Sequence, residues 1–258
     1  MNLSGNTILI TGGSSGIGFE MAKEFLAAKN IVIITGRNLD KLEKAKEKLG
    51  DVTIIQSDVS NPDSIRELYE QVSKEFSALN ILINNAGVMF TINLQKHDLS
   101  ANELTKELDI NVKGTIWMND AFLPLLKKNK NSATVMVSSG LAFVPLPISP
   151  IYSATKAAVH SYTLSLRGQL KNTGVKVFEL APPATETELL ADSNEEDMKG
   201  ISIMTVQAMV ADFLKSFSKN KLEICPGQSS QMKFMSRYFP GFILKQMSKT
   251  IDRMHATS

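Results

Sequence analysis

Short apolar runs recur along the chain between longer segments whose apolar residues repeat at helical spacing. Each run is too short for a stable helix and several end at glycine or asparagine, so the runs predict β-strands. They lie at residues 7–11, 31–35, 52–56, 80–84, 133–137, 175–180 and 222–225. The runs are apolar almost throughout rather than alternating, which is typical of parallel strands that are covered on both faces.

The segments between these runs predict amphipathic helices. They lie at residues 16–28, 40–49, 61–76, 100–128, 151–170 and 206–217. Segment 100–128 is either one long helix or a broken one, because Asn111 interrupts its apolar side. Strands that alternate with helices in this way predict an α/β fold with a doubly wound, mostly parallel sheet flanked by helices, of the Rossmann type.

The length of 258 residues, without repeats or a linker-like tract, predicts a single domain over residues 1–258. Two parts of it differ in composition from the rest. Residues 186–204 are polar and form a candidate substrate lid, with an ordinary solvated loop as the alternative. Residues 228–258 are rich in methionine and aromatic residues, and they predict a helical extension that closes over a substrate site or packs on a partner subunit.

Charge and composition exclude several classes of function. The chain has 28 Lys and Arg residues against 26 Asp and Glu, a net charge of +2, so we expect no nucleic-acid partner. We also expect a cytoplasmic protein without a membrane span, because no targeting signal and no long apolar stretch occur. The single cysteine, Cys225, can form no internal disulfide. The three histidines lack metal-ligand spacing, so we expect no metal site.

A glycine-rich turn connects the first predicted strand to the first helix. Glycines there allow a tight turn, a close approach of the backbone to a ligand, and close packing of helix on strand. The amide end of the helix carries partial positive charge and suits a phosphate group. The candidate cofactor-binding residues of this turn are Gly12, Ser14, Ser15, Gly16, Ile17 and Gly18. The alternative is a plain strand-to-helix turn.

Arg37 follows the second predicted strand, at the place where an acidic residue usually binds the ribose hydroxyls of NAD. A carboxylate would repel a 2′-phosphate, whereas a guanidinium binds it with charge-assisted hydrogen bonds. The sequence therefore predicts NADP(H) as the cofactor and makes NAD(H) the less favoured one. The alternative for Arg37 is a solvated loop charge.

The ends of the third and fourth predicted strands add further candidates, because ligands of open α/β sheets bind at the carboxyl ends of the strands. Asp58 and Val59 follow the third strand, and Asp58 is a candidate acceptor for an adenine amine. Asn85, Ala86 and Gly87 follow the fourth strand and let the chain pass close to a cofactor. For the asparagine, a hydrogen bond to the cofactor and a bond that braces neighbouring backbone remain equally open.

Tyr152 and Lys156 lie four residues apart on the predicted helix 151–170 and therefore share one face. A neighbouring ammonium favours the phenolate, so we expect Lys156 to lower the pKa of Tyr152. Ser139 follows the fifth predicted strand and reaches the same edge of the sheet, where its hydroxyl is a candidate partner for a substrate carbonyl. Taken alone, the Tyr–Lys pair has an ordinary surface pair as its alternative.

These motifs together resemble the short-chain dehydrogenase/reductase family over residues 3–227. The resemblance rests on the glycine turn at 11–18, the Asn-Asn-Ala-Gly sequence at 84–87 and the Tyr-x-x-x-Lys sequence at 152–156. It implies a seven-stranded doubly wound sheet and a catalytic tetrad of Asn111, Ser139, Tyr152 and Lys156. The double proline at 182–183 and the methionine-rich tail resemble the DltE-type oxidoreductase branch.

The resemblance also implies a reaction, in which hydride passes between NADP(H) and a carbonyl or secondary alcohol substrate while Tyr152 serves as general acid/base. Lys156 would bond the nicotinamide ribose and Asn111 would hold a water. Pro182, Thr185 and Thr187 would contact the nicotinamide, although Pro183 removes an amide donor there. The family commonly forms homodimers or homotetramers. The alternatives are a non-catalytic NADP(H)-binding sensor or scaffold, and a partner protein that attaches to membranes through its tail.

Overall fold

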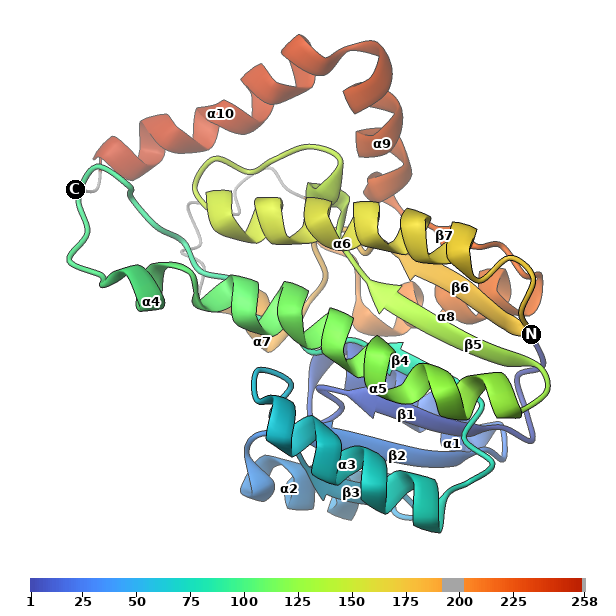
Figure 1. Cartoon of the computed structure of the whole chain (residues 1–258). Helices are drawn as coiled ribbons and strands as arrows, with labels where there is room; N and C mark the ends of the chain where they lie inside the picture. The colour runs from blue at the N-terminus through green and yellow to red at the C-terminus, as the bar shows by residue number, and fades with distance from the viewer. Residues whose placement is uncertain (192–201, 257–258) are drawn as a thin grey trace.

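The computed structural model describes residues 1–191 and 202–256 and contains the predicted seven-stranded parallel sheet. The strands are β1 Thr7–Thr11, β2 Ile31–Gly36, β3 Thr53–Gln56, β4 Ile81–Asn84, β5 Ser132–Val137, β6 Val175–Leu180 and β7 Glu223–Ile224. Their order is β3-β2-β1-β4-β5-β6-β7, and every neighbouring pair is parallel (Figure 1). The chain thus winds outward from β1 in both directions, and the predicted fold class is confirmed.

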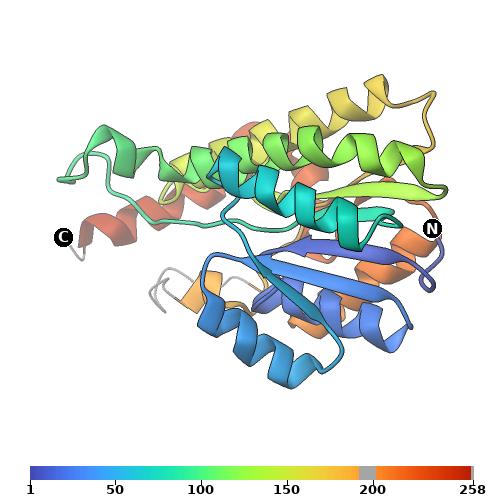
Figure 2. The same ribbon diagram turned by 60° about the horizontal axis from the view of Figure 1, so that its bottom comes forward.

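Helices cover both faces of the sheet. The α-helices are α1 Gly16–Ala27, α2 Leu39–Leu49, α3 Pro62–Glu75, α4 Ala101–Leu104, α5 Gly114–Lys128, α6 Pro150–Gln169, α7 Glu188–Ala191, α8 Val206–Ser218, α9 Gln228–Tyr238 and α10 Pro240–Ala256. Helices α1, α2 and α8 pack on one face, and α3, α5 and α6 pack on the other (Figure 2). None of these described helices is both long and apolar enough to cross a membrane.

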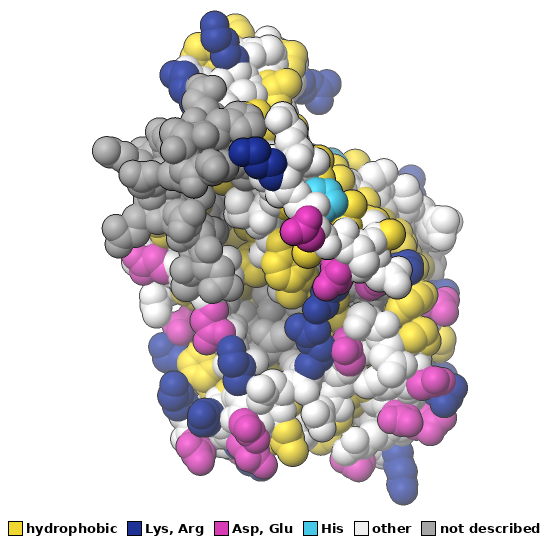
Figure 3. Space-filling model, turned by 90° about the vertical axis from the view of Figure 1, so that its left-hand side faces the viewer, with side chains coloured by type: hydrophobic (Ala, Val, Ile, Leu, Met, Phe, Trp, Pro, Cys, Tyr) yellow, Lys and Arg dark blue, Asp and Glu magenta, His cyan; other side chains and the backbone are white. Residues whose placement is uncertain are grey.

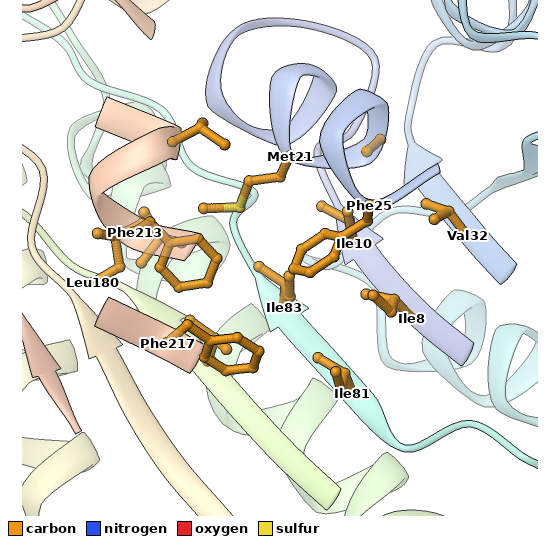
Figure 4. Close-up of a cluster of buried hydrophobic side chains, with 14 of the residues drawn as sticks. Ile8, Ile10, Met21, Phe25, Val32, Ile81, Ile83, Leu180, Phe213 and Phe217 are labelled. Carbon is orange, nitrogen blue, oxygen red and sulfur yellow. The ribbon is translucent and has the colours of Figure 1, made fainter. Parts of the chain in front are cut away.

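Large apolar side chains fill the space between the sheet and its helices. On the face of α1 and α8, Phe25, Phe213 and Phe217 are fully buried against isoleucines of β1 and β4 (Figure 4). The Phe213 and Phe217 rings lie 5.2 Å apart between centroids. Each such buried side chain contributes about 1.5–3 kcal/mol. This packing fixes the strands, and so it fixes the loops that leave their carboxyl ends.

The predicted segment 100–128 is a broken helix. Between α4 and α5 the chain forms a π-helix, η1, over Leu108–Lys113. The side chain of Asn111 inside η1 forms two hydrogen bonds with the backbone of Val88, in the segment that follows β4. Short π-helical segments occur frequently at functional sites. The interruption that Asn111 makes in the apolar pattern therefore marks a real change of helix geometry.

The two segments that differ in composition have different outcomes. Residues 192–201 of the candidate lid 186–204 lie outside the described residues. Met204, at its end, forms a β-bridge with Thr185, the residue directly before it. The predicted extension 228–258 contains α9 and α10. Helix α9 packs on the short 3-10 helix η2, Gly140–Ala142, since a Cβ on Gly140 would lie 2.8 Å from Ser229 Oγ. The extension therefore begins close to the candidate serine, Ser139.

Candidate active site

The candidate residues lie on the loops at the carboxyl edge of the sheet. The strand order reverses between β1 and β4, and ligands of open α/β sheets bind at this kind of switch point. Figure 3 looks onto this edge, where hydrophobic side chains lie between the C-terminal extension above and charged side chains below. The functional groups of the site therefore come from segments that are distant in the sequence.

The glycine turn packs tightly on the segment that follows β4. Gly12 has a φ of +65°, and a Cβ there would lie 2.9 Å from Ala86 Cα. A Cβ on Gly18 would lie 2.5 Å from Asn85 Nδ2. Real Cβ atoms do not approach other atoms this closely, so only glycine fits at these positions. The structure thus brings the predicted turn and the predicted 85–87 segment together.

Asn85 braces this turn. Its side-chain amide donates to the carbonyl oxygens of Thr11 at 2.9 Å and Gly12 at 3.0 Å. The backbone amides of Asn85 and Ala86 both donate to Thr11 Oγ1 at 3.0 Å. Of the two roles that the sequence left open for this asparagine side chain, the structure contains the bracing one. Both of its amide hydrogens are used in holding the turn in shape.

The start of α1 presents backbone amides to the same edge. Ser15 precedes the helix with extended backbone, and its side chain makes no capping hydrogen bond. Gly16 has a φ of +54°, and a Cβ on it would lie 3.2 Å from Thr187 Cγ2. The first amides of Ile17 and its neighbours are left without helical partners, as in any helix, and they suit an anion.

Arg37 lies beside this turn at the end of β2. A Cβ on the preceding Gly36 would lie 3.7 Å from Ser14 Oγ, so Ser14 and the end of β2 are neighbours. The Arg37 side chain is exposed, and its backbone oxygen accepts a hydrogen bond from Gln56 at 2.8 Å. The exposed Arg37 side chain and the Ser14 hydroxyl thus come from adjacent segments, and each can bind a phosphate group.

Asp58 and Val59 leave the end of β3. One carboxylate oxygen of Asp58 accepts from Ser60 Oγ at 2.7 Å and from the Ser60 amide at 2.9 Å. Val59 is buried, and its Cγ2 lies 2.9 Å from where a Cβ on Gly114 would be. Asp58 is therefore held in a defined orientation, while Val59 packs against the start of α5.

Tyr152, Lys156 and Ser139 converge at the ends of β5 and α6. All three are buried, with exposed fractions of 6%, 4% and 9%. The Lys156 ammonium lies 5.5 Å from the centroid of the Tyr152 ring and donates to the Val137 backbone oxygen at 2.9 Å. The Ser139 hydroxyl accepts from the Leu141 amide at 3.1 Å. This arrangement places a phenol, an ammonium and a hydroxyl around one point of the sheet edge.

The pKa of Tyr152 differs from what the sequence predicted. Burial raises the pKa of the phenol above its usual value, the nearby Ser139 hydroxyl lowers it, and the charge of Glu107 raises it. The predicted net lowering of this pKa is therefore wrong, because burial outweighs the effects that lower it. Burial lowers the pKa of Lys156 to about 8, and the charge of Glu107 opposes that shift.

Asn111 joins three parts of the site. Its Oδ1 accepts from the Val88 amide at 2.9 Å, and its Nδ2 donates to the Val88 oxygen at 2.9 Å and to Thr155 Oγ1 at 3.0 Å. Thr155 in turn donates to the Tyr152 backbone oxygen at 2.7 Å. A Cβ on Gly87 would lie 3.2 Å from Asn111 Oδ1 and 3.4 Å from Lys156 Nζ. Asn111 thus connects η1, the 87–88 segment and α6.

The segment after β6 closes the site from the other side. The Pro182 backbone oxygen accepts from the Gly140 amide at 2.8 Å, one residue beyond Ser139. Thr185 donates to the Pro183 oxygen at 2.9 Å, and Thr187 donates to the Thr185 oxygen at 3.3 Å. Through Thr187, this segment also reaches the start of α1 at Gly16. The structure therefore gathers every candidate residue along one edge.

Two buried acids at the site were missed by the sequence analysis. Glu107 is 2% exposed and acts on the pKa values of both Tyr152 and Lys156. Glu179 is fully buried behind the serines, where it accepts from Ser138 Oγ at 2.6 Å and bonds His160 Nδ1 at 2.8 Å. A spacing signal for Glu107 was present, since it lies four residues before Asn111 and shares its helix face. Over residues 1–191 and 202–256, no group of His, Cys, Asp and Glu side chains could hold a metal ion.

Several known proteins are similar to this chain. The family model described as short chain dehydrogenase matches residues 6–198. The uncharacterized oxidoreductase DltE of Bacillus subtilis strain 168 is 40% identical over 226 residues, which cover 87% of this chain and 89% of the relative. The uncharacterized oxidoreductase SA2266 of Staphylococcus aureus strain N315 is 31% identical over 229 residues, with 87% and 98% covered.

Solved structures share the fold. A short-chain dehydrogenase from Burkholderia cenocepacia J2315, solved in complex with NADP, has a TM-score of 0.83 at 22% identity and covers 96% of this chain and 99% of its own. A short-chain dehydrogenase from Sphingobium yanoikuyae, solved with NADPH, has a TM-score of 0.75 at 27% identity, with 85% and 87% covered. The chain belongs to the short-chain dehydrogenase/reductase family of oxidoreductases and, within it, to the DltE-type branch.

Proposed function

We propose that this protein is an NADP(H)-dependent oxidoreductase that interconverts a carbonyl compound and a secondary alcohol, with Tyr152 as the general acid/base. The observation that carries the proposal is the convergence of the Tyr152 phenol with Ser139 and Lys156 at the switch-point edge of the sheet. A buried phenol with a hydroxyl and an ammonium nearby can exchange a proton with a substrate oxygen placed beside it. The intact group of side chains argues against a purely binding protein.

The described residues fit a dinucleotide. There is no room for a side chain at Gly12 or Gly18, so the backbone of the turn packs closely and a ligand can approach it. The amides after Ser15 are available for a diphosphate. Arg37 and Ser14 would bind a 2′-phosphate, Asp58 the adenine, and Pro182, Thr185 and Thr187 the nicotinamide end. When bound, NADP(H) supplies or accepts the hydride. The neighbours from Burkholderia cenocepacia and Sphingobium yanoikuyae, solved with NADP and NADPH, support this choice of cofactor.

Each polar side chain then has one task. The Ser139 hydroxyl donates to the substrate oxygen and polarises the carbonyl, and the Tyr152 hydroxyl gives that oxygen its proton. Lys156 bonds the ribose and holds positive charge beside the phenol. Asn111 Oδ1 retains one lone pair beyond its bond from Val88, and we assign it the water that links Lys156 to solvent.

Burial keeps Tyr152 in its protonated form. Burial raises the pKa of Tyr152, so the phenol keeps its proton at neutral pH, and this is the form that carbonyl reduction uses. Alcohol oxidation would need the phenolate, which burial disfavours. Lys156, with its pKa lowered to about 8, is still mainly protonated at neutral pH. We propose carbonyl reduction as the main direction, because NADP(H) leans toward reduction in a cell, and we propose that the protein is cytoplasmic.

NADPH consumption across aldehydes, ketones, diketones and quinones tests this function. We expect turnover by the native protein and a loss of at least about 100-fold in Tyr152→Phe, because the proton donor is gone. NADPH affinity, followed by its fluorescence, should change little. Tyr162→Phe removes a hydroxyl from the same helix α6 and should keep activity. Full activity in Tyr152→Phe would contradict the assignment of the acid, and absence of NADPH binding would contradict the cofactor.

A further inference from the structure

Glu107 is a buried acid in a place where the chain could have carried an apolar residue. It is 2% exposed, although its neighbours Lys106 and Leu108 are exposed. Burying a carboxylate is costly unless it is paired and hydrogen-bonded, so a buried glutamate needs an explanation. The position of Glu107 directly before η1, four residues from Asn111, brings it to the candidate active site.

Glu107 and Asn111 together hold one stretch of backbone. Glu107 Oε1 accepts from the Phe90 amide at 2.9 Å, while Asn111 accepts from the Val88 amide and donates to the Val88 oxygen. Two side chains of one helix therefore fix alternate residues of the segment that follows β4. This segment begins at Gly87, where a Cβ would lie 3.4 Å from Lys156 Nζ. The segment that Glu107 anchors thus borders the Lys156 ammonium.

The charge of Glu107 also acts on Lys156 and raises its pKa. Helices α6 and η1 pack against each other, and within the described part of the chain Glu107 is the one carboxylate whose charge acts on Lys156. The other ionisable group close to the ammonium is Tyr152, which lies on the same helix as Lys156. The ammonium makes one hydrogen bond to a backbone oxygen, at Val137, which carries no full charge. A buried ammonium without a counter-charge would lose its proton more readily.

We propose that Glu107 is a positioning residue of the Tyr152–Lys156 pair: its carboxylate anchors the 88–90 backbone through Phe90 and serves as the counter-charge of the Lys156 ammonium. The inference rests on the proposed function, because it assigns Glu107 a task within that site. It adds a fifth polar side chain to the four that the family resemblance implies.

A titration of Lys156 tests the counter-charge without turnover. In protein labelled with 13C-lysine, the Cε signal of Lys156 is identified by its absence in Lys156→Met. Glu107→Gln keeps an acceptor for the Phe90 amide but removes the charge, so we expect the pKa of Lys156 to fall by about one unit or more. Asp109→Asn is the matched control, because Asp109 pairs with Lys113 on the surface of the same segment. An unchanged Lys156 titration in Glu107→Gln would overturn the proposal.

Kinetics give a second reading. Glu107 raises the pKa of both Tyr152 and Lys156, so removing its charge should move the alkaline limb of kcat for carbonyl reduction to lower pH, whichever group controls that limb. Glu107→Asp, which keeps the charge, should return the limb toward its native position. If the native protein turns over no substrate, the proposed function fails while the Lys156 titration still decides the role of Glu107.

A reciprocal measurement covers the case in which Glu107→Gln does not fold. If the carboxylate stabilises the ammonium, the ammonium stabilises the carboxylate by the same amount. The Glu107 carboxyl should therefore titrate at higher pH in Lys156→Met than in the native protein. Its 13Cδ signal reports the titration, and the signal is identified by its absence in Glu107→Asp. A Glu107 titration that is the same with and without Lys156 would overturn the proposal.

Discussion

In the proposed cofactor site, Arg37 is the charged residue that favours NADP(H) over NAD(H). Arg37→Asp replaces a guanidinium by a carboxylate beside Ser14, so the ribose hydroxyls of NADH gain an acceptor and the 2′-phosphate of NADPH is repelled. A hydrogen bond to a charged group contributes about 1.5–3 kcal/mol. We therefore expect kcat/KM with NADPH to fall by about 10- to 100-fold and the preference to move toward NADH.

Lys44→Asp serves as the control for this exchange. It makes the same change of charge on the exposed side of α2, a few residues away. Its kcat/KM values for the two cofactors should keep the native ratio. A native ratio in Arg37→Asp as well would show that the guanidinium does not bind the 2′-phosphate.

Lys156 should make the stability of the fold depend on pH. Its pKa is about 8 in the folded protein against an ordinary value of 10.5, so the unfolded chain holds this proton more tightly. Burial of Lys156 therefore lowers the free energy of unfolding below pH 8. This loss of stability disappears as the pH rises from about 8 toward 10.5, the pKa of lysine in the unfolded chain. We expect the free energy of unfolding of the native protein, relative to Lys156→Met, to rise over this window. Urea unfolding at a series of pH values measures it, and a constant difference between the two proteins would contradict the assignment.

The chemistry-bearing residues differ in how far the sequence could predict them. Tyr152 and Lys156 share a helix, and their spacing alone places them on one face. Glu107 was missed because its partner, the Phe90 amide, belongs to a loop whose course no periodic pattern encodes. Glutamates are also almost never fully buried unless they are paired, so a single glutamate in a polar helix is read as a surface residue.

At the level of elements, a charged pair joins helix α6 to strand β6. His160 bonds the buried Glu179, while Glu223 and Lys233 also act on its charge and the Phe143 ring packs edge-on at 5.1 Å. Glu179 raises the pKa of His160, so the folded state binds this proton more tightly than the unfolded chain. The resulting stabilisation is complete below the unfolded pKa of about 6.5 and is lost as the pH rises through the folded value.

His160→Gln tests this pairing, because glutamine can still donate to Glu179 but carries no charge. The Tm of the native protein should exceed that of the variant by about 2 °C more at about pH 5.5 than at about pH 9. His97→Gln, which alters an exposed histidine, should show no such difference. An equal gap for His160→Gln at both pH values would mean that the pair is neutral throughout.

The elements themselves followed from the sequence to differing degrees. The strands were predictable because a parallel sheet buries both faces and so produces continuous apolar runs, as in the fully buried β1. The break in segment 100–128 was left open, because a π-helix adds a residue to one turn without a distinctive composition. The π-helix accompanies a contact between distant segments, the hydrogen bond from the Val88 amide to Asn111, and a sequence pattern within one helix does not encode such a contact.

For the whole molecule, the prediction concerns assembly. Leu108, Ile116 and Leu164 are exposed by 36%, 37% and 45% on η1, α5 and α6. Apolar residues gathered on neighbouring helices mark surfaces that bind other chains. In light scattering, Leu164→Glu should therefore give a smaller assembly than the homo-oligomer that we expect of the native protein. Phe242→Glu, at a 57% exposed site on α10, is the matched control and should keep the native mass.

A monomeric native protein would contradict the prediction. A loss of mass in Phe242→Glu alone would mean that the interface lies on the C-terminal extension.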